Sequence, residues 1–162
     1  MSKVYHGSIE EVKYPEIRQS SHSLDYGTGF YTMTSYEQAK RWVERKMSIK
    51  GLSVGYVNVY EFNDDTIKNL KTLFFDKPTE EWVNFVRRNR TEKDFDHNYD
   101  IVYGPVANDS VYTQFTLCEG GIISMQTLIQ ELKTYKLVDQ YLFHTEKSLA
   151  AIKFVESKTI KL

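Results

Sequence analysis

The chain has few of the features that mark secreted or membrane-bound proteins. Its 162 residues include one cysteine, Cys118, so no disulfide can form within the chain, as is usual in a reducing compartment. No apolar run approaches the roughly 20 residues of a membrane span, and Met1 to Lys3 leads into no signal-peptide core. We therefore expect a cytoplasmic protein without a membrane partner, although an effector exported by another route would look the same.

An excess of charge of one sign is also missing. The 21 basic and 22 acidic residues give a formal net charge of -1, so no overall basic field favours nucleic acid or anionic lipid. There is no P-loop, no Gly-rich Rossmann fingerprint and no nucleophile elbow. His22, His97 and His144 lack the spacing of metal ligands, so no metal site is expected.

What is present is the composition of an ordinary globular protein, with 41% hydrophobic and 27% charged residues. The length predicts one domain over residues 1–162 with a core of its own. Strand-like and helix-like patterns are interspersed along the chain, which predicts an α+β fold. We expect strands at 4–6, 30–34, 54–62, 70–75, 100–103, 137–144 and 152–160. We expect helices at 36–49, after Pro78 and Thr79, at 111–117, after Ser124 and at 148–151, with weak helical periodicity over 9–18 and a loop over 19–26.

Two of these elements have the clearest local signals. The helix 36–49 begins after Ser35, with Gln38 placed to complete a capping box, and ends at Gly51. Its inward face is predicted to carry Ala39, Trp42, Val43 and Met47. The segment 54–62 is mainly apolar on both faces, with Asn58 interrupting one and Glu61 the other, which predicts a central strand covered on both sides.

Three short motifs, read together, resemble a known family. They are Tyr5-His6-Gly7-Ser8, Gly27-Thr28-Gly29-Phe30-Tyr31 followed by a Ser-led helix, and Asp139-Gln140-Tyr141-Leu142-Phe143. In this order they resemble the motifs of ADP-ribosyltransferases of the diphtheria-toxin-like, poly-ADP-ribose-polymerase branch. Residues 99–109 look like the signature of a poorly characterised bacterial subfamily of that superfamily. The resemblance implies a split two-sheet core with NAD bound between the sheets, and a catalytic triad of His6, Tyr31 and Gln140.

The resemblance also implies a role for each residue. Gly7 would hold the nicotinamide carboxamide through its main chain, His6 would bind the adenosine ribose, and Ser8 would bind the amide. Tyr31 would stack on the nicotinamide ring, and Trp42 could close its other face. The residues implied to contact NAD are therefore His6, Gly7, Ser8, Gly29, Tyr31 and Trp42.

The third motif departs from the family pattern, because Gln140 stands where the family has Glu. Glutamine can still accept a hydrogen bond from a ribose hydroxyl, but it carries no negative charge, and losing such a partner costs about 3 kcal/mol. Polymer elongation is therefore not expected. Mono-ADP-ribosylation requires either a nucleophilic acceptor or a second carboxylate near the pocket, for which Asp109 and Glu119 are candidates. An inactive enzyme is the other outcome.

The favoured function is NAD-dependent mono-ADP-ribosyl transfer to an unknown macromolecule, in a bacterial toxin-like role that could involve an antitoxin. The alternative is a non-catalytic module that binds NAD or ADP-ribose. A carboxylate beside Gln140 would discriminate between them. Transfer onto nucleic acid is a third possibility, supported only by the cluster of Arg87, Arg88 and Arg90 and tested by whether those arginines line the cleft.

Each residue also has a simpler structural explanation. His6 could be a half-buried strand residue, and Gly27 to Gly29 could form a hairpin or bulge. Tyr31 and Trp42 could belong to the core, and Gln140 could lie on a strand surface. Asn108 and Asp109, the accessory candidates for the site, could simply cap a helix. The arginine cluster could be a solvated helix face near Glu80 and Glu81.

Overall fold

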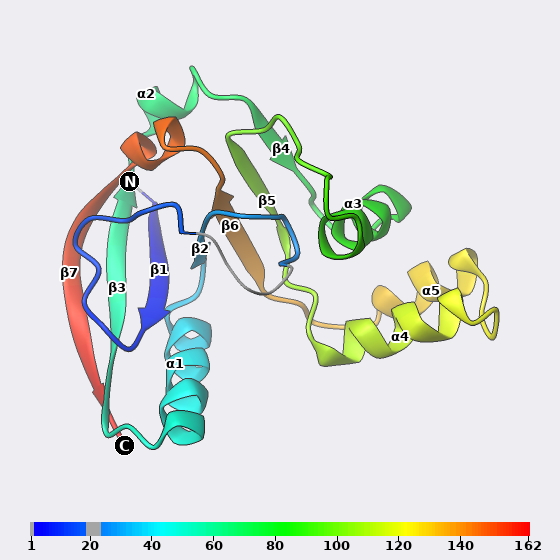
Figure 1. Cartoon of the computed structure of the whole chain (residues 1–162), viewed down its shortest axis with the longest axis horizontal. Coiled ribbons are helices and arrows are strands. Elements are labelled where there is room, and N and C mark those ends of the chain that lie inside the picture. The colour runs from blue at the N-terminus through cyan, green and yellow to red at the C-terminus, as the bar shows by residue number, and fades with distance from the viewer. Residues whose placement is uncertain (1, 19–23) are drawn as a thin grey trace.

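A computed structural model describes residues 2–18 and 24–162, and its strands form one mixed seven-stranded sheet (Figure 1). The strand order is β4-β5-β6-β2-β1-β3-β7, and only β4 and β5 run parallel. The strands are β1 (Lys3–Ser8), β2 (Phe30–Met33), β3 (Val54–Phe62), β4 (Thr72–Phe74), β5 (Ile101–Pro105), β6 (Asp139–Phe143) and β7 (Ile152–Lys161). The predicted α+β class is confirmed, and β3 occupies the internal position expected for it. The prediction of a split two-sheet core is wrong, since hydrogen bonds between neighbouring strands join all seven into one sheet.

The weakest joint of this sheet lies between β1 and β2. These strands share a single residue pair, Tyr5 with Met33, whereas β1 has six pairs with β3 and β2 has four with β6. In Figure 1 the group β7-β3-β1 accordingly stands apart from the group β2-β6-β5-β4. The two halves that the resemblance implied as separate sheets therefore remain joined at one point, and the strands part beyond it.

Five α-helices occur in the part of the chain that the structure describes. They are α1 (Tyr36–Lys50), α2 (Asp64–Ile67), α3 (Glu80–Thr91), α4 (Asp109–Glu119) and α5 (Met125–Leu132), and a short 3₁₀ helix, η1 (Lys147–Ala151), precedes β7. The side chains of Ser35, Thr79, Asn108 and Ser124 each accept a backbone N–H from the third residue of the helix they begin. These caps explain why the sequence predicts most helix starts closely. The exception is α2, which the sequence does not predict.

Helix α1 packs against β1 and β3 through Ala39, Val43 and Met47, which are all buried. The contact is close, because a Cβ on Gly55 of β3 would lie 2.7 Å from the Met47 sulfur. Trp42, predicted on the same buried face, is 41% exposed. It lies beside the buried face of α1 and borders the cavity described below.

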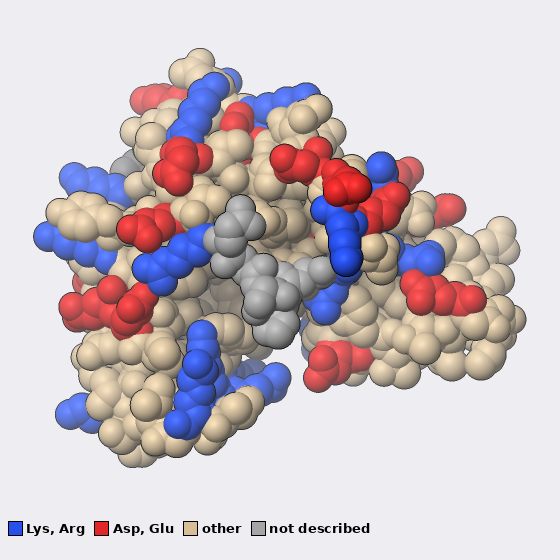
Figure 2. Space-filling view, viewed as in Figure 1, with Lys and Arg blue, Asp and Glu red and all other residues tan. Residues whose placement is uncertain are grey.

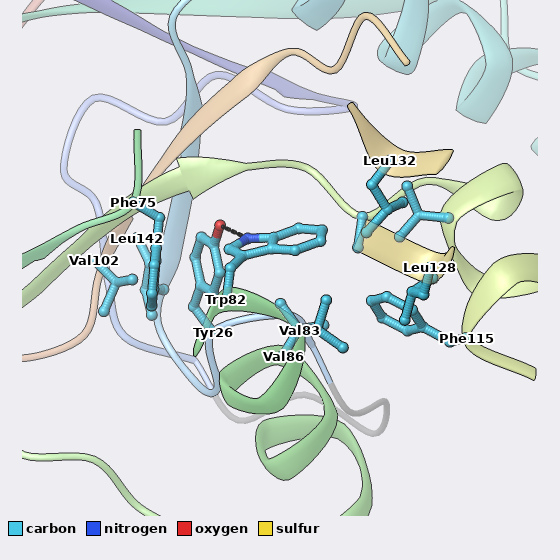
Figure 3. Packing of buried hydrophobic residues seen from close by; sticks show 12 residues of the cluster. Tyr26, Phe75, Trp82, Val83, Val86, Val102, Phe115, Leu128, Leu132 and Leu142 are labelled. Atoms are coloured by element: carbon cyan, nitrogen blue, oxygen red, sulfur yellow. Dashed lines mark hydrogen bonds between the residues drawn. The ribbon is translucent and has the colours of Figure 1, made fainter. Parts of the chain in front are cut away.

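The largest apolar cluster lies between the β5–β6 part of the sheet and helices α3, α4 and α5 (Figure 3). Trp82 of α3 lies at its centre, and its indole N–H donates to the Tyr26 hydroxyl at 2.8 Å. The same hydroxyl donates to the Pro105 carbonyl at 2.7 Å. Tyr26 is fully buried, so it anchors the chain just before β2 to both α3 and β5.

The segment after β1, residues 9–18, crosses one face of the sheet without forming a helix (Figure 1). We call it the crossing segment. The helix that its weak periodicity indicates does not form. Its backbone is held from below: Val12 donates its N–H to Asn58 Oδ1 at 3.0 Å, and Val12 O accepts from the Tyr60 hydroxyl. Residues 19–23 of the loop expected next lie outside the described residues.

No helix among the described residues has both the length and the apolar character needed to cross a bilayer.

Candidate functional site

A cavity of about 640 Å³ opens where β1 and β2 part. Its walls come from β1, the crossing segment, residues 24–33, α1, α3, the turn after β5, and β6. Cavities of roughly 300–1,000 Å³ are typical of small-molecule sites. All three motifs singled out in the sequence contribute to it, through residues far apart in the chain: His6, Gly7, Ser8, Gly29, Tyr31 and Gln140, together with Trp42.

His6 lies in the cavity wall and is held in one orientation. Its Nδ1 lies 2.7 Å from the Tyr31 carbonyl oxygen, and its ring packs on Phe30 with centroids 4.3 Å apart. Because a carbonyl can only accept, Nδ1 carries the proton and Nε2 is left as an acceptor. Burial lowers the pKa of His6 from 6.5 to about 4, with Lys46 and Arg18 adding to the effect, so the imidazole is neutral near pH 7.

Tyr31 belongs partly to the wall and partly to the core. Its hydroxyl donates to the Gly27 carbonyl at 2.5 Å and accepts the Tyr26 N–H at 3.0 Å, which closes the turn that leads into β2. Burial raises its pKa well above the ordinary value of 10.0, so the phenol stays protonated. Tyr31 is among the residues that line the cavity, and its hydroxyl is engaged at the turn, so this side chain would contact a ligand through its ring.

The structure gives the motif glycines packing roles. A Cβ on Gly7 would lie 2.7 Å from the Ala39 carbonyl oxygen, so this glycine allows α1 to approach β1. Gly29 has φ +153°, and a Cβ there would collide with the Phe143 carbonyl oxygen on β6. Their small size is therefore required by the fold, whether or not a ligand binds.

Gln140 of β6 is buried at the cavity wall, and its side chain meets a carboxylate. Its Nε2 donates to Asp25 Oδ2 at 3.1 Å. Asp25 is itself buried and lines the cavity. The carboxylate beside Gln140 is therefore Asp25, a residue that sequence reasoning missed. The signal available was an Asp two residues before the first motif glycine, inside a stretch interpreted only as a polar loop.

The other carboxylates considered from the sequence lie elsewhere. Neither Asp109 nor Asn108 is among the residues that line the cavity, and Asn108 caps α4 by accepting the Val111 N–H at 3.0 Å. Glu119, at the far end of α4, pairs with Arg87 at 2.9 Å.

Only one residue of the arginine cluster reaches the cavity. Arg90 lines it and donates to Asp25 Oδ1 at 3.0 Å. Arg87 is paired with Glu119, and Arg88 pairs with Glu92 at 2.7 Å. The face seen in Figure 2 carries acidic and basic side chains intermixed, with no continuous basic surface.

Trp42 and Lys46 form part of the α1 wall of the cavity. The Lys46 ammonium lies 4.9 Å from the centre of the Trp42 ring, in a cation–π arrangement. Ser8 lies at the end of β1, where its hydroxyl accepts the Glu10 N–H at 3.2 Å. Lys46 and Arg18 are the other cations of the lining, and no sequence motif points to them.

Within the described ranges 2–18 and 24–162, no group of three or more His, Cys, Asp or Glu residues is placed so that it could hold a metal ion. His97 and His144 do meet, with ring centroids 4.0 Å apart, but they bind the backbone of the Tyr26–Thr28 turn. His22, considered with them from the sequence, lies outside the described residues.

Comparison with known proteins places the chain in one family. Residues 2–154 match the model of DUF3990, described as a protein of unknown function, and the chain therefore belongs to this family. No curated protein matches the chain. No solved structure matches it either.

Proposed function

We propose that this protein binds NAD in the cavity between β1 and β2 and transfers its ADP-ribose to a macromolecular acceptor. The observation that carries the proposal is the convergence of His6, Tyr31 and Gln140, from three separate motifs, on one cavity. The resemblance to ADP-ribosyltransferases singles out these three residues, and chance would not be expected to bring them to the same wall. The reaction, the acceptor and a cytoplasmic toxin-like role are all parts of the proposal.

The residues present suit a ribose-containing ligand. His6 Nε2 and Gln140 Oε1 are both neutral acceptors, and among the described residues no hydrogen bond uses either atom. Ribose hydroxyls are donors that match them. The Tyr31 ring offers an apolar surface for a flat heterocycle, and Lys46 supplies positive charge for a diphosphate. Arg18 also lines the cavity, where it pairs with Glu10 at 3.0 Å and Glu16 at 3.3 Å.

The chemistry requires the bond between nicotinamide and ribose C1′ to break. The bonding electron pair leaves with the ring nitrogen, so the pyridinium becomes neutral nicotinamide. An acceptor nucleophile forms the new bond to C1′ and loses its proton to solvent or to a base of its own. Gln140 would hold the 2′-hydroxyl while positive charge develops on the ribose, with less stabilisation than a carboxylate gives.

Asp25 favours an enzyme over a binding module. A carboxylate beside Gln140 was the feature expected to discriminate between the two, and Asp25 lies hydrogen-bonded to that Gln. Four donors occupy its oxygens, so it would support Gln140 and would not serve as a base. The arginines do not favour a nucleic-acid acceptor, because two of the three are paired with Glu side chains away from the cavity. The nature of the acceptor stays open within the proposal.

The test is release of free nicotinamide from NAD by the purified protein, with and without cell lysate. Calorimetry measures NAD binding in parallel. We expect wild-type protein to bind NAD and release nicotinamide, and Gln140→Ala to reduce release by at least about tenfold. The matched control is Gln126→Ala, on the exposed surface of α5, which should behave as wild type.

Three outcomes discriminate between the functions. Release that needs lysate indicates a specific acceptor, which labelled NAD can then identify. NAD binding that is lost in His6→Ala, with no release under any condition, favours the non-catalytic module. Wild-type protein that neither binds NAD nor releases nicotinamide refutes the proposal.

A further inference from the structure

The buried carboxylate of Asp25 is fully occupied by donors from four parts of the chain. Oδ1 accepts from Arg90 at 3.0 Å and from the Tyr112 hydroxyl at 2.8 Å. Oδ2 accepts from the Ala107 N–H at 3.0 Å and from Gln140 Nε2 at 3.1 Å. A carboxylate offers about four acceptor positions, and all are used. Because all of its acceptor positions are used, Asp25 has no free lone pair with which to act as a base. Arg90 balances its charge.

This arrangement fixes the direction of the Gln140 amide. An ionised carboxylate only accepts, so it must face the NH₂ end of the amide. The reversed amide would set Oε1 against Oδ2, with two acceptors in contact and a buried carboxylate one donor short. The NH₂ end therefore points to Asp25. The Gln140 side chain also bonds the Tyr26 hydroxyl, which already donates to the Pro105 carbonyl and so can only accept from the same NH₂ end. Oε1 is the end left for another partner. Since Gln140 lines the cavity, that partner can be a hydroxyl of a bound ligand.

We propose that Asp25 is a positioning residue that holds Gln140 with its amide oxygen toward the ligand hydroxyl, and that Gln140 is matched to Asp25 rather than being a weakened Glu. The inference rests on the proposed function, because the hydroxyl in question is that of the NAD ribose. Its chemical basis is the contact itself. A Glu at position 140 would place two carboxylates about 3 Å apart, where both cannot stay ionised.

The charged and titratable groups around this pair belong to three elements and to the turn before β2. They are Arg90 from α3, Tyr112 from α4, Tyr31 from β2, and Tyr26 from the turn. Burial and the Asp25 charge both raise the pKa of Tyr112, so its hydroxyl remains a donor across the accessible pH range. Burial likewise raises the pKa of the other two phenols. A new inflection in activity near neutral pH in the Gln140→Glu variant would therefore report the carboxylate pair.

The experiment is a double-mutant cycle on the full chain with Asp25→Asn, Gln140→Glu and the two combined. Each protein is measured for kcat and KM of nicotinamide release, for its pH profile and for melting temperature. The matched control is Asp94→Asn, an exposed carboxylate in the loop after α3, which should match wild type.

We expect each single variant to lower kcat by at least about tenfold. Asp25→Asn leaves two donors or two acceptors facing each other, and Gln140→Glu leaves two carboxylates facing each other. Gln140→Glu should also show an additional inflection in its pH profile. In the combined variant an amide again faces a carboxylate. Its kcat should exceed the product of the single effects by about tenfold or more, and the additional inflection should disappear.

Multiplicative effects in the combined variant, in protein that melts as wild type does, would overturn the inference while leaving the proposed function intact. Wild-type protein without NAD binding and without release would instead overturn the proposed function, and this inference with it. If Asp25→Asn does not fold, the side-chain amide protons of Gln140 in the wild type decide by NMR. Slow solvent exchange relative to exposed Gln126 supports the contact with Asp25, and equally fast exchange refutes it.

Discussion

The stability of this protein should fall as the pH is lowered from 7 to 4, and His6 should account for much of the change. Its folded-state pKa is about 4, against an ordinary value of 6.5, because burial disfavours the imidazolium. Between these two pH values His6 binds a proton in the unfolded chain but stays neutral in the folded chain. Stability is therefore fully present above about pH 6.5 and is lost progressively as the pH approaches 4.

The two pKa values set the size of the effect. A shift from 6.5 to about 4 makes folding less favourable by about 2.5 kcal/mol at pH 4.5 than at pH 7.5. His97, whose pKa burial also lowers, acts in the same direction, so the wild-type curve alone does not isolate His6. The variant His6→Gln removes the titrating group and can still donate to the Tyr31 carbonyl.

The assay is urea unfolding of wild type and His6→Gln across this pH range. We expect the difference in unfolding free energy between the two proteins to change by about 2.5 kcal/mol, with the variant losing less stability in acid. A direct NMR titration of the His6 ring should give a midpoint near 4. A midpoint above about 6, or a free-energy difference that is constant with pH, would refute the reasoning.

Three further changes test the packing around the site. Gly7→Ala should cost about 1–3 kcal/mol in chemical denaturation, because the added methyl meets the Ala39 carbonyl and α1 must shift; an unchanged midpoint would contradict this. Trp82→Phe keeps an aromatic ring but removes the N–H that binds the Tyr26 hydroxyl, so we expect a loss of about 1 kcal/mol or more by the same method. Asn58→Ala should free the backbone of the crossing segment, seen as faster hydrogen exchange of its amides, and unchanged exchange would count against the tether.

The elements that the sequence predicts well are those whose signals are local. The ends of α1 follow from Ser35, which caps the helix, and from Gly51, whose φ of +68° ends it. Strand β3 has the predicted bounds because most of its nine residues are β-branched or aromatic. Neither prediction needs knowledge of a distant segment.

The crossing segment shows where local reasoning fails. Its periodicity suggests a helix, but its conformation is set by Asn58, which donates to the His6 and Glu10 carbonyls and accepts from Val12. The sequence pattern treats this Asn as an interruption of an apolar strand face. In the fold it is the polar group that satisfies a backbone lying over the sheet.

Some residues of the candidate site can likewise be predicted from the sequence, and others cannot. The motifs lead to His6, Tyr31 and Gln140 because a resemblance supplies their order. Asp25 has no such signal, since its position is created by Arg90 and Ala107 arriving from other parts of the chain. Helical spacing alone assigns Trp42 to the buried face, whereas in the fold this side chain lies next to Gly7 of β1 at the wall of the cavity and is partly exposed.

The parting of β1 and β2 explains why a side chain such as His6 belongs at this position. The ladder between these strands stops after Tyr5 and Met33, so the Tyr31 carbonyl receives its hydrogen bond from His6 Nδ1 and not from the β1 backbone. The imidazole thus completes the sheet and faces the cavity at the same time. A His6→Ala variant would lose both contributions, and its inactivity alone could not separate them. His6→Gln retains a donor for the Tyr31 carbonyl. A loss of NAD binding in that variant at unchanged stability would therefore assign the binding role to the ring nitrogen, and retained binding would reduce His6 to a structural residue.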